Sequence, residues 1–279
     1  LGSIYAIIAL GYTMVYGIAK MLNFAHGDVI MVGGYISFCA MFYLHLPNVV
    51  AVLLAVVVCT VLGIFIERLA YKPLRQAPPL SVLITAIGVS YFLQNLALIL
   101  FGSQQKAYPT IVQLGQVTIG SVTIDGVTIL TLLVTALIMV VLSFFINRTR
   151  MGKAMRATAQ NRKMALLLGI NADRIISLTF IVGSALAALG GVLIASHMGQ
   201  VNFGIGFLAG LKAFTAAVLG GIGSIPGAMV GGLVLGIAES MTTGYLSGNY
   251  EDALAFALLI LILIFRPDGI LGKAKVQKV

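Results

Sequence analysis

The sequence predicts an all-α polytopic membrane protein, and two observations carry that prediction. Of its 279 residues, 60% are hydrophobic and only 9% are charged, whereas a soluble domain carries about 25% charged residues. Too few polar side chains remain to cover a folded chain of this length in water. The apolar residues also gather into runs of the length that a helix needs to cross a bilayer, about 20 residues.

Nine apolar segments are candidate transmembrane helices, and they predict about eight crossings with interrupted or half helices among them. They cover residues 1–19, 29–46, 49–66, 80–101, 127–146, 175–196, 206–222, 227–246 and 251–265. The segment 206–222 is the weakest candidate, because it is short, rich in glycine and contains Lys212. The number of crossings stays open at eight or nine, and the side of the N-terminus stays open with it.

Pairs of glycines four residues apart recur in the second half of the chain, as in Gly206/Gly210, Gly227/Gly231 and Gly232/Gly236. In lipid this spacing lets helix backbones approach closely, so we expect tight helix packing there.

Positive charge gathers in three places, residues 67–76, 148–174 and the tail 266–279. The net charge of +9 would suit a nucleic-acid binder only if the basic residues shared one solvated face. Here they separate apolar runs, so we expect all three segments on the cytoplasmic side. Segment 102–126 then lies outside. Within it, two β-type runs around Gly120-Ser121 predict a hairpin, either a surface cap or part of a docking surface for an external partner.

Catalytic chemistry is not visible in the sequence. It contains no nucleotide-binding P-loop, no His-Glu-x-x-His helix and no Gly-x-Ser-x-Gly elbow, so we expect no catalytic residue and no metal site. Cys39 and Cys59 lie inside apolar segments and are expected to be small buried hydrophobes. His26 and Asp28 are the only close His/acid pair. Their spacing places them on different helix faces, which makes an intramembrane enzyme the weakest alternative.

The segment from Met151 to Arg174 is the most informative soluble feature. Ala154 to Leu168 lacks Gly and Pro and predicts one helix, ended by Gly169. Asn171-Ala172-Asp173 then caps the next span. The side chains left exposed, unless the membrane or another protein covers them, are Met155, Ala159 and Leu166 to Leu168. The helix is therefore either an interfacial helix on lipid headgroups or a coupling helix in a groove of a separate cytoplasmic subunit.

Two matching interruptions each precede an apolar segment: Asn23-Phe24-Ala25-His26-Gly27 and Asn202-Phe203-Gly204-Ile205-Gly206. Interrupted segments in corresponding halves of a chain point to a transport site near the midplane of the membrane. The alternative is two ordinary loops whose asparagines cap the following helices. Lys212 and Glu239 also lie within predicted spans, and we expect them to pair across adjacent helices or to line a pathway.

Several stretches resemble the LivH-type permease of branched-chain amino-acid ABC importers, within the binding-protein-dependent transport system permease family. They are GYTMVYGI at 11–18, LNFAHGDV at 22–29, MGKAMRA…MALLLGI ending at Ile170, KAFTAAVLGGIGSIPGA at 212–228 and RPDGILG at 266–272. The resemblance covers nearly the whole chain. It implies one transmembrane permease domain over 1–279 that is not itself an enzyme, in the bacterial inner membrane. The implied function is movement of leucine, isoleucine or valine, driven by ATP hydrolysis in separate subunits.

The resemblance also implies partners: a related LivM-type permease in a heterodimer, two cytoplasmic ATPase subunits that bind ATP and Mg²⁺, and a periplasmic amino-acid-binding protein. No cofactor is implied for this chain itself. It further implies that loop 102–126 is periplasmic and that loop 148–174 is the cytoplasmic coupling loop. The alternative to this reading is a self-sufficient secondary transporter or channel for a small amphipathic solute.

The family's ATPase-contacting loop maps onto about Gly152 to Gly169. This sequence lacks the E-A-A and the terminal Pro of the better-known importer loop, so contacts do not transfer residue by residue. The residues assigned to the coupling loop are Gly152, Arg156, Ala157, Ala159, Asn161, Ala165 and Gly169. The residues assigned to the substrate pathway are Asn23, His26, Gly27, Asn202 and Gly206. Selectivity rests either with this pathway or with the binding protein.

Overall fold

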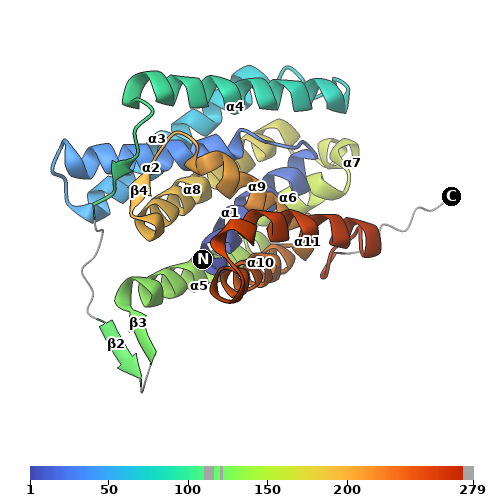
Figure 1. The fold of residues 1–279 in the computed structure, drawn as a ribbon. Coiled ribbons are helices and arrows are strands. Elements are labelled where there is room, and N and C mark those ends of the chain that lie inside the picture. Colours follow the sequence, from blue (N-terminus) through green and yellow to red (C-terminus); the bar gives the residue numbers. More distant parts are fainter. Residues whose placement is uncertain (110–115, 120–121, 273–279) are drawn as a thin grey trace.

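A computed structural model describes residues 1–109, 116–119 and 122–272, and it is a bundle of helices with two small pairs of strands (Figure 1). The helices are α1 (Gly2–Ala19), α2 (His26–Phe42), α3 (Asn48–Ile66), α4 (Pro79–Phe101), α5 (Gly126–Arg148), α6 (Arg150–Gln160), α7 (Arg162–Leu167), α8 (Ala172–Met198), α9 (Ile205–Gly220), α10 (Ile225–Tyr245) and α11 (Glu251–Phe265). A π-helical turn, η1 (Glu67–Tyr71), continues α3, and a 3₁₀ turn, η2 (Gly248–Tyr250), precedes α11.

The predicted fold class is confirmed, because each of the nine apolar segments coincides with a helix. Seven of the described helices are long and apolar enough to cross a membrane: α1, α3 with η1, α4, α5, α8, α10, and η2 with α11. The helices α2 and α9 are apolar but shorter, with 17 and 16 residues. These two short helices are the ones that follow the two matching interruptions.

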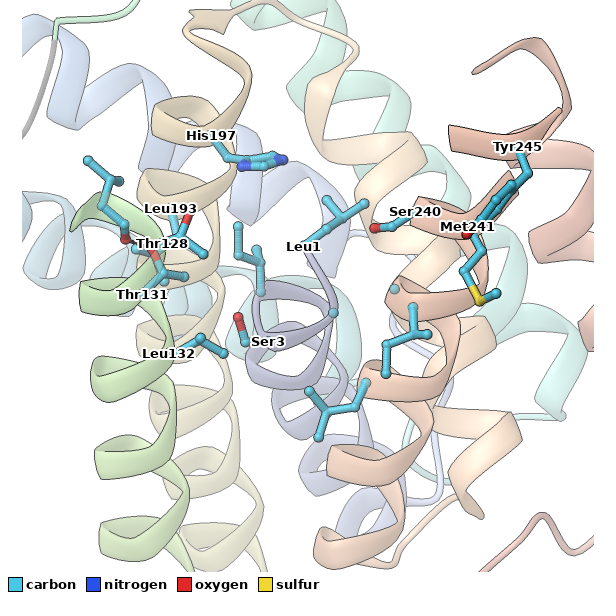
Figure 2. A pocket seen from close by; sticks show the side chains of 16 residues that line it. Leu1, Ser3, Thr128, Thr131, Leu132, Leu193, His197, Ser240, Met241 and Tyr245 are labelled. Atoms are coloured by element: carbon cyan, nitrogen blue, oxygen red, sulfur yellow. Dashed lines mark hydrogen bonds between the residues drawn. The ribbon is translucent and has the colours of Figure 1, made fainter. Parts of the chain in front are cut away.

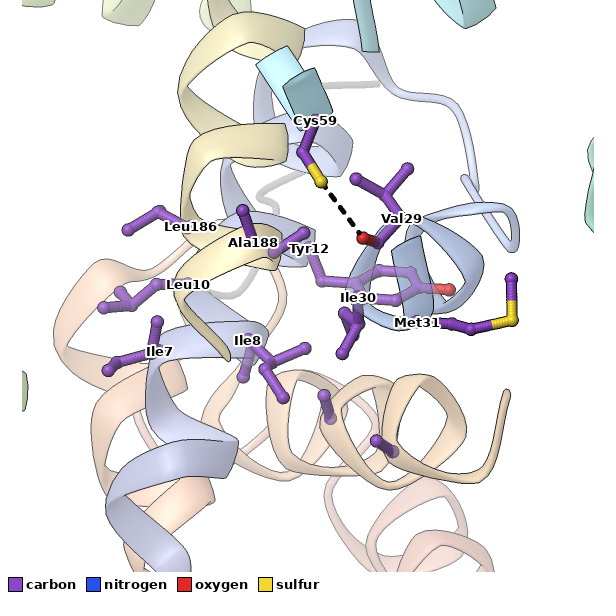
Figure 3. Packing of buried hydrophobic residues seen from close by; sticks show 14 of the residues in the cluster. Ile7, Ile8, Leu10, Tyr12, Val29, Ile30, Met31, Cys59, Leu186 and Ala188 are labelled. Carbon is purple, nitrogen blue, oxygen red and sulfur yellow. Dashed lines mark hydrogen bonds between the residues drawn. The ribbon is translucent and has the colours of Figure 1, made fainter. Parts of the chain in front are cut away.

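The core of the bundle is built around α1, which packs against α8, α9 and α10, while α2 packs against α3, α8 and α9. Figure 3 shows Ile8 of α1 on the side that faces Ile30 of α2, with Ala188 of α8 above it and Ile7 on the other side of α1, and all four are buried. Cys59 of α3 lies in the same cluster, with its Sγ 3.6 Å from the carbonyl oxygen of Val29. A helix that is apolar on every side needs to be surrounded by protein or lipid, and α1 is surrounded by protein.

The outer helices present large apolar side chains to their surroundings. Leu100 of α4 is 66% exposed, Val140 of α5 is 67% exposed and Ile264 of α11 is 68% exposed. Such surfaces suit a hydrocarbon solvent and not water. Both cysteines are free, with Cys59 buried as predicted and Cys39 only half-buried.

Glycines in α10 bring its backbone against two other helices. A Cβ on Gly231 would lie 2.0 Å from the carbonyl oxygen of Ala216 in α9, and one on Gly236 would lie 2.1 Å from the Cα of Gly2 in α1. Both distances are far too short for a side-chain carbon. The close packing that the glycine spacing predicts is therefore confirmed on both faces of α10.

The two ends of the bundle differ. One end, here called the basic end, carries η1, α6, α7 and the chain after α11 (Figure 1). The opposite end, the hairpin end, carries β2 (Gln116–Ile119) paired antiparallel with β3 (Val122–Asp125), with Val117 opposite Ile124. The strands of the predicted hairpin are thus confirmed, while its turn at Gly120-Ser121 lies outside the described residues. The three lysines of the tail beyond residue 272 also lie outside the described residues.

A second strand pair closes the hairpin end over the core. The strand β1 (Lys106–Ala107) pairs antiparallel with β4 (Gln200–Val201), and the Tyr108 hydroxyl lies 2.7 Å from the Ser37 hydroxyl in α2. Burial raises the pKa of Tyr108 to about 12, so the phenol stays neutral at ordinary pH and can keep this hydrogen bond. The connection after α4 is thereby tied to the loop that leads into α9.

Candidate functional site

The two Asn-Phe-x-x-Gly motifs meet inside the bundle, although 179 positions separate them in the sequence. Each lies just before or within the first turn of a short helix, α2 or α9. A Cβ on Gly206 would lie 2.1 Å from the carbonyl oxygen of Gly27, and one on Gly27 would lie 2.6 Å from the carbonyl oxygen of Gly206. Gly210 packs on the same spot, with its Cβ position 2.7 Å from the Cα of Gly27. The two helices therefore cross backbone to backbone at the motif glycines.

The two asparagines have different partners. The Asn23 Oδ1 accepts a hydrogen bond of 2.8 Å from the Tyr71 hydroxyl in η1. The Asn202 Oδ1 accepts one of 2.9 Å from the backbone N–H of Gly204. Among the described residues, neither asparagine makes a side-chain cap on the short helix that follows it. The simple capping alternative is therefore wrong for both, although Asn202 does stabilise its own loop.

His26 and Asp28 point in different directions from the first turn of α2. The His26 ring lies against α1, with its centroid 4.9 Å from that of Tyr12, and its side chain is buried. The Asp28 Oδ1 instead accepts a hydrogen bond of 3.0 Å from the Gln94 amide in α4. As the spacing predicts, the two residues do not form a dyad. Within the described part of the chain, the Asp28 Oδ2 and the His26 Nε2 have no hydrogen-bond partner.

A cluster of charges joins α9, α10 and α11 beside the second motif. The Lys212 ammonium pairs with Glu239, which confirms the pairing expected across adjacent helices. It also lies 2.7 Å from Asp252 and 3.2 Å from Glu251, both in the first turn of α11. One buried ammonium group thus forms ion pairs with three carboxylates. Their oxygens lie within 4.8 Å of one another, but the ammonium of Lys212 already contacts all three groups.

The contribution of α11 to this cluster could not be read from the sequence. Acidic residues in a first helical turn are common, because they interact favourably with the helix dipole. Glu251 and Asp252 stand 39 and 40 positions after Lys212, and only the packing of α11 on α9 brings them together.

Two cavities open in the same half of the bundle. The smaller, of about 230 Å³, is lined by Asn202, Lys212, Glu251 and Asp252 together with apolar side chains such as Leu208. Its wall therefore combines hydrogen-bonding and charged groups with a hydrophobic surface. That combination suits a small amphipathic solute.

The larger cavity, of about 540 Å³, lies between α1, α5, α8 and α10 at the hairpin end. Figure 2 shows Thr128 and Thr131 of α5 and His197 of α8 on one side of it, with Ser240 and Tyr245 of α10 on the other. Its lining is mostly apolar with scattered hydroxyls. This cavity could not be predicted from the sequence, because its lining comes from four separate helices.

The predicted coupling helix is two helices, which corrects the single helix expected over 154–168. The chain breaks at Asn161, whose backbone is extended (φ −154°, ψ 105°). The Asn161 side chain accepts a 3.1 Å hydrogen bond from the Met164 backbone and so caps α7. Asparagine readily starts a helix in this way, and that local bond replaces the continuous helix. Gly169 does stop α7, with φ 78°, and the Asn171 side chain does cap α8 through the Arg174 backbone, as predicted.

Several residues assigned to the coupling loop hold the segment on the bundle. A Cβ on Gly152 would lie 2.2 Å from the Ile146 carbonyl oxygen of α5, and the Arg156 guanidinium donates to that same oxygen at 3.0 Å. Ala165 is buried. Met155, expected to be exposed, has no exposed surface because α6 packs against α5 and α8. Ala157 and Ala159 are half-buried.

A cluster of exposed apolar side chains lies at the end of α7 and is here called the α7 tip. It consists of Met164, Leu166, Leu167 and Leu168, and Leu167 and Leu168 are 81% and 74% exposed. The prediction of exposed leucines at 166–168 is thus confirmed.

These features define a polytopic membrane transport protein: apolar spans, two short helices that meet at paired interruptions, and an exposed soluble segment at one end. The chain belongs to the family described as branched-chain amino acid transport system, permease component, whose model matches residues 1–263. The resemblance noted from the sequence motifs is therefore confirmed.

Curated relatives of this family match the chain over its full length. The chain is 51% identical to the high-affinity branched-chain amino acid transport system permease protein BraD of Pseudomonas aeruginosa and 50% identical to LivH of Escherichia coli K12. In both cases the match covers 100% of this chain and 94% of the relative. A probable LivH of Methanocaldococcus jannaschii is 27% identical, over 97% of this chain and 89% of the relative. No solved structure gives a significant match.

Proposed function

We propose that this chain is the permease subunit of an ABC importer for leucine, isoleucine and valine in a bacterial inner membrane. The observation that carries the proposal is the match of the whole chain to two high-affinity branched-chain amino acid permeases at 50% identity or more. The chain forms one transmembrane domain with no catalytic residue of its own. A LivM-type permease, two ATPase subunits with ATP and Mg²⁺, and a periplasmic binding protein complete the importer.

The proposed orientation places the basic end in the cytoplasm. Loop 148–174 and the tail 266–279 are then cytoplasmic, and loop 102–126 is periplasmic. Leu1 shares the large cavity of the hairpin end with Tyr245 and His197, so α1 starts on the periplasmic side in this arrangement.

The α7 tip is the proposed contact with an ATPase subunit. Three leucines and a methionine are exposed there beside Lys163, at the cytoplasmic end of the bundle. Apolar side chains that stand free in water gain from burial in a partner's groove, roughly 1.5–3 kcal/mol for one leucine. Docking of the tip therefore accounts for a separate short helix at this place.

Replacement of Leu167 by aspartate tests this contact. Because Leu167 is 81% exposed, Leu167→Asp should leave the fold intact. It should weaken co-purification of the ATPase subunits about tenfold or more, the factor expected when burial of one leucine is lost. Met151→Asp, at an exposed position on α6, is the matched control and should retain the subunits. Equal retention in Leu167→Asp and wild type would mean that the tip lies on lipid headgroups instead.

The proposed substrate path runs along the crossing of α2 and α9. A branched apolar side chain needs no hydrogen-bond partner, but the zwitterionic end of an amino acid needs hydrogen-bond partners once it leaves water. Asn23, His26 and Asn202, with the backbone around Gly27 and Gly206, would provide them. The small cavity beside Asn202 supports the proposal, because it sets an amide, a lysine and two carboxylates beside an apolar wall.

Asn202 offers a sharp test of the path. Asn202→Ala removes both the hydrogen bond to Gly204 and any contact with substrate. Asn202→Asp keeps an oxygen for the Gly204 N–H but removes the amide donor. We expect both variants to lower uptake about tenfold, the equivalent of one hydrogen bond of roughly 1.4 kcal/mol, with the complex still assembled. Asn23→Ala should lower uptake to a similar extent. Normal uptake in Asn202→Asp would leave Asn202 with a role in its loop alone.

A further inference from the structure

A continuous series of polar contacts runs through the basic end of the bundle, starting at α7. The Arg162 guanidinium donates to the Asp173 carboxylate at 2.8 Å, and Arg75, in the connection between η1 and α4, donates to the same oxygen at 2.5 Å. The other terminal nitrogen of Arg75 pairs with Glu67, the first residue of η1. Charged groups therefore join the segment of α7 and α8 to the segment of η1, which lies 98 positions away in the sequence at the contact of Arg75 with Asp173.

The pair of Arg75 and Glu67 is buried. The Arg75 side chain is 5% exposed and that of Glu67 is not exposed at all. The second carboxylate oxygen of Glu67 accepts a hydrogen bond of 2.9 Å from the Ser177 hydroxyl in α8. A buried charge requires its partners, so these groups cannot separate freely. The start of α8 and the turn η1 are thus constrained to move together.

The turn η1 carries the series on to the first motif. Its last residue, Tyr71, is 1% exposed and donates its hydroxyl hydrogen bond to Asn23. A π-helical turn is uncommon, and this one ends the helix that α3 begins. Here it places Glu67 and Tyr71 so that one faces α8 and Arg75 while the other faces the loop before α2.

We propose that Arg75 is a positioning residue that couples the segment of α7 and α8 to the loop before α2, through Glu67, η1 and Tyr71. A displacement of α7 shifts Asp173 and Arg75, and the buried pair passes that shift to η1 and Asn23. The inference rests on the proposed function in one respect, namely that an ATPase subunit acts on α7. The physical link between α8 and the loop at 20–25 does not depend on that.

The experiment compares two variants in the assembled importer in proteoliposomes. The double variant Glu67→Gln/Arg75→Gln removes both buried charges together, so that neither is left without its partner, and Asp173 keeps Arg162. Arg68→Gln is the matched control, because Arg68 is an exposed arginine of the same turn. We expect the double variant to assemble and hydrolyse ATP while its uptake per ATP hydrolysed falls about tenfold. The control should match wild type.

Hydrogen exchange of the backbone amides at 20–27 provides a second measurement that does not involve transport. The double variant and Tyr71→Phe should both exchange faster there than wild type, and Arg68→Gln should not. Unchanged exchange at 20–27 in the double variant would overturn the link. Faster exchange with wild-type uptake per ATP would overturn the coupling role. Failure of the proposed function shows separately, as wild-type uptake that does not depend on ATP.

Discussion

Replacing Gly206 by alanine should destabilise this protein strongly, because it puts a methyl group into the crossing of α2 and α9. The new Cβ would lie 2.1 Å from the carbonyl oxygen of Gly27 and 2.8 Å from the Cβ of Met31. The first clash is with backbone, which no change of rotamer relieves, so α2 and α9 must move apart. Overpacking of a tight core costs about 1–3 kcal/mol and occasionally more, and we expect the upper part of that range.

Cys59 is a natural reporter for this effect. It is fully buried in the core, so in a Cys39→Ser background a thiol-reactive dye labels the protein only as it unfolds. Gly206→Ala should bring labelling to a clearly lower temperature. Gly244→Ala in α10 is the matched control, because nothing among the described residues lies within 4 Å of its Cβ position. Labelling of Gly206→Ala at the wild-type temperature would contradict the close crossing of the two helices.

Replacing Lys212 by methionine should have the second large effect. The substitution keeps the length of the side chain but leaves Glu239, Glu251 and Asp252 together without their ammonium group. Loss of one partner from a buried ion pair costs about 3–5 kcal/mol. The lower end applies here, because Glu251 and Asp252 are 34% and 45% exposed and water screens them partly.

A comparison of variants isolates the charge effect. Glu239→Gln should be milder than Lys212→Met, since Lys212 keeps Glu251 and Asp252 as partners. The double variant Lys212→Met/Glu239→Gln should recover part of the stability lost in Lys212→Met, because one of the three stranded charges is gone. Labelling of Cys59 against temperature measures all three. Equal loss in Glu239→Gln and Lys212→Met would show that the cluster does not depend on its single cation.

The sequence alone predicts those features of the fold that depend on neighbouring residues. Apolar runs predict the nine helices because the hydrocarbon core offers no water, so the backbone N–H and C=O groups have to form their hydrogen bonds within a helix. The hairpin strands, the stop at Gly169 and the cap by Asn171 follow from preferences of single residues. The two motifs are recognisable as a pair in the sequence. Their backbones can meet at Gly27 and Gly206 because glycine has no side chain.

Longer-range features could not be predicted, for reasons visible in particular residues. The break at Asn161 rests on one side-chain hydrogen bond that competes with a stretch of good helix formers. Met155 is buried because α6 packs on α5 and α8. The spacing of Gly152, Met155 and Thr158 marks one face of α6, but it does not show what covers that face. The contacts of Arg75 with Asp173, and of Ser177 with Glu67, span 98 and 110 positions. Such pairs are set by packing alone.

Uptake of labelled leucine into proteoliposomes tests the central claim, that this chain is a permease driven by separate ATPase subunits, most directly. The chain would be reconstituted alone, and together with a LivM-type permease, the two ATPase subunits and the binding protein, each with and without ATP. We predict accumulation only in the complete assembly and only with ATP. Accumulation by this chain alone, driven by an ion gradient without ATP, would contradict the claim and identify a secondary transporter.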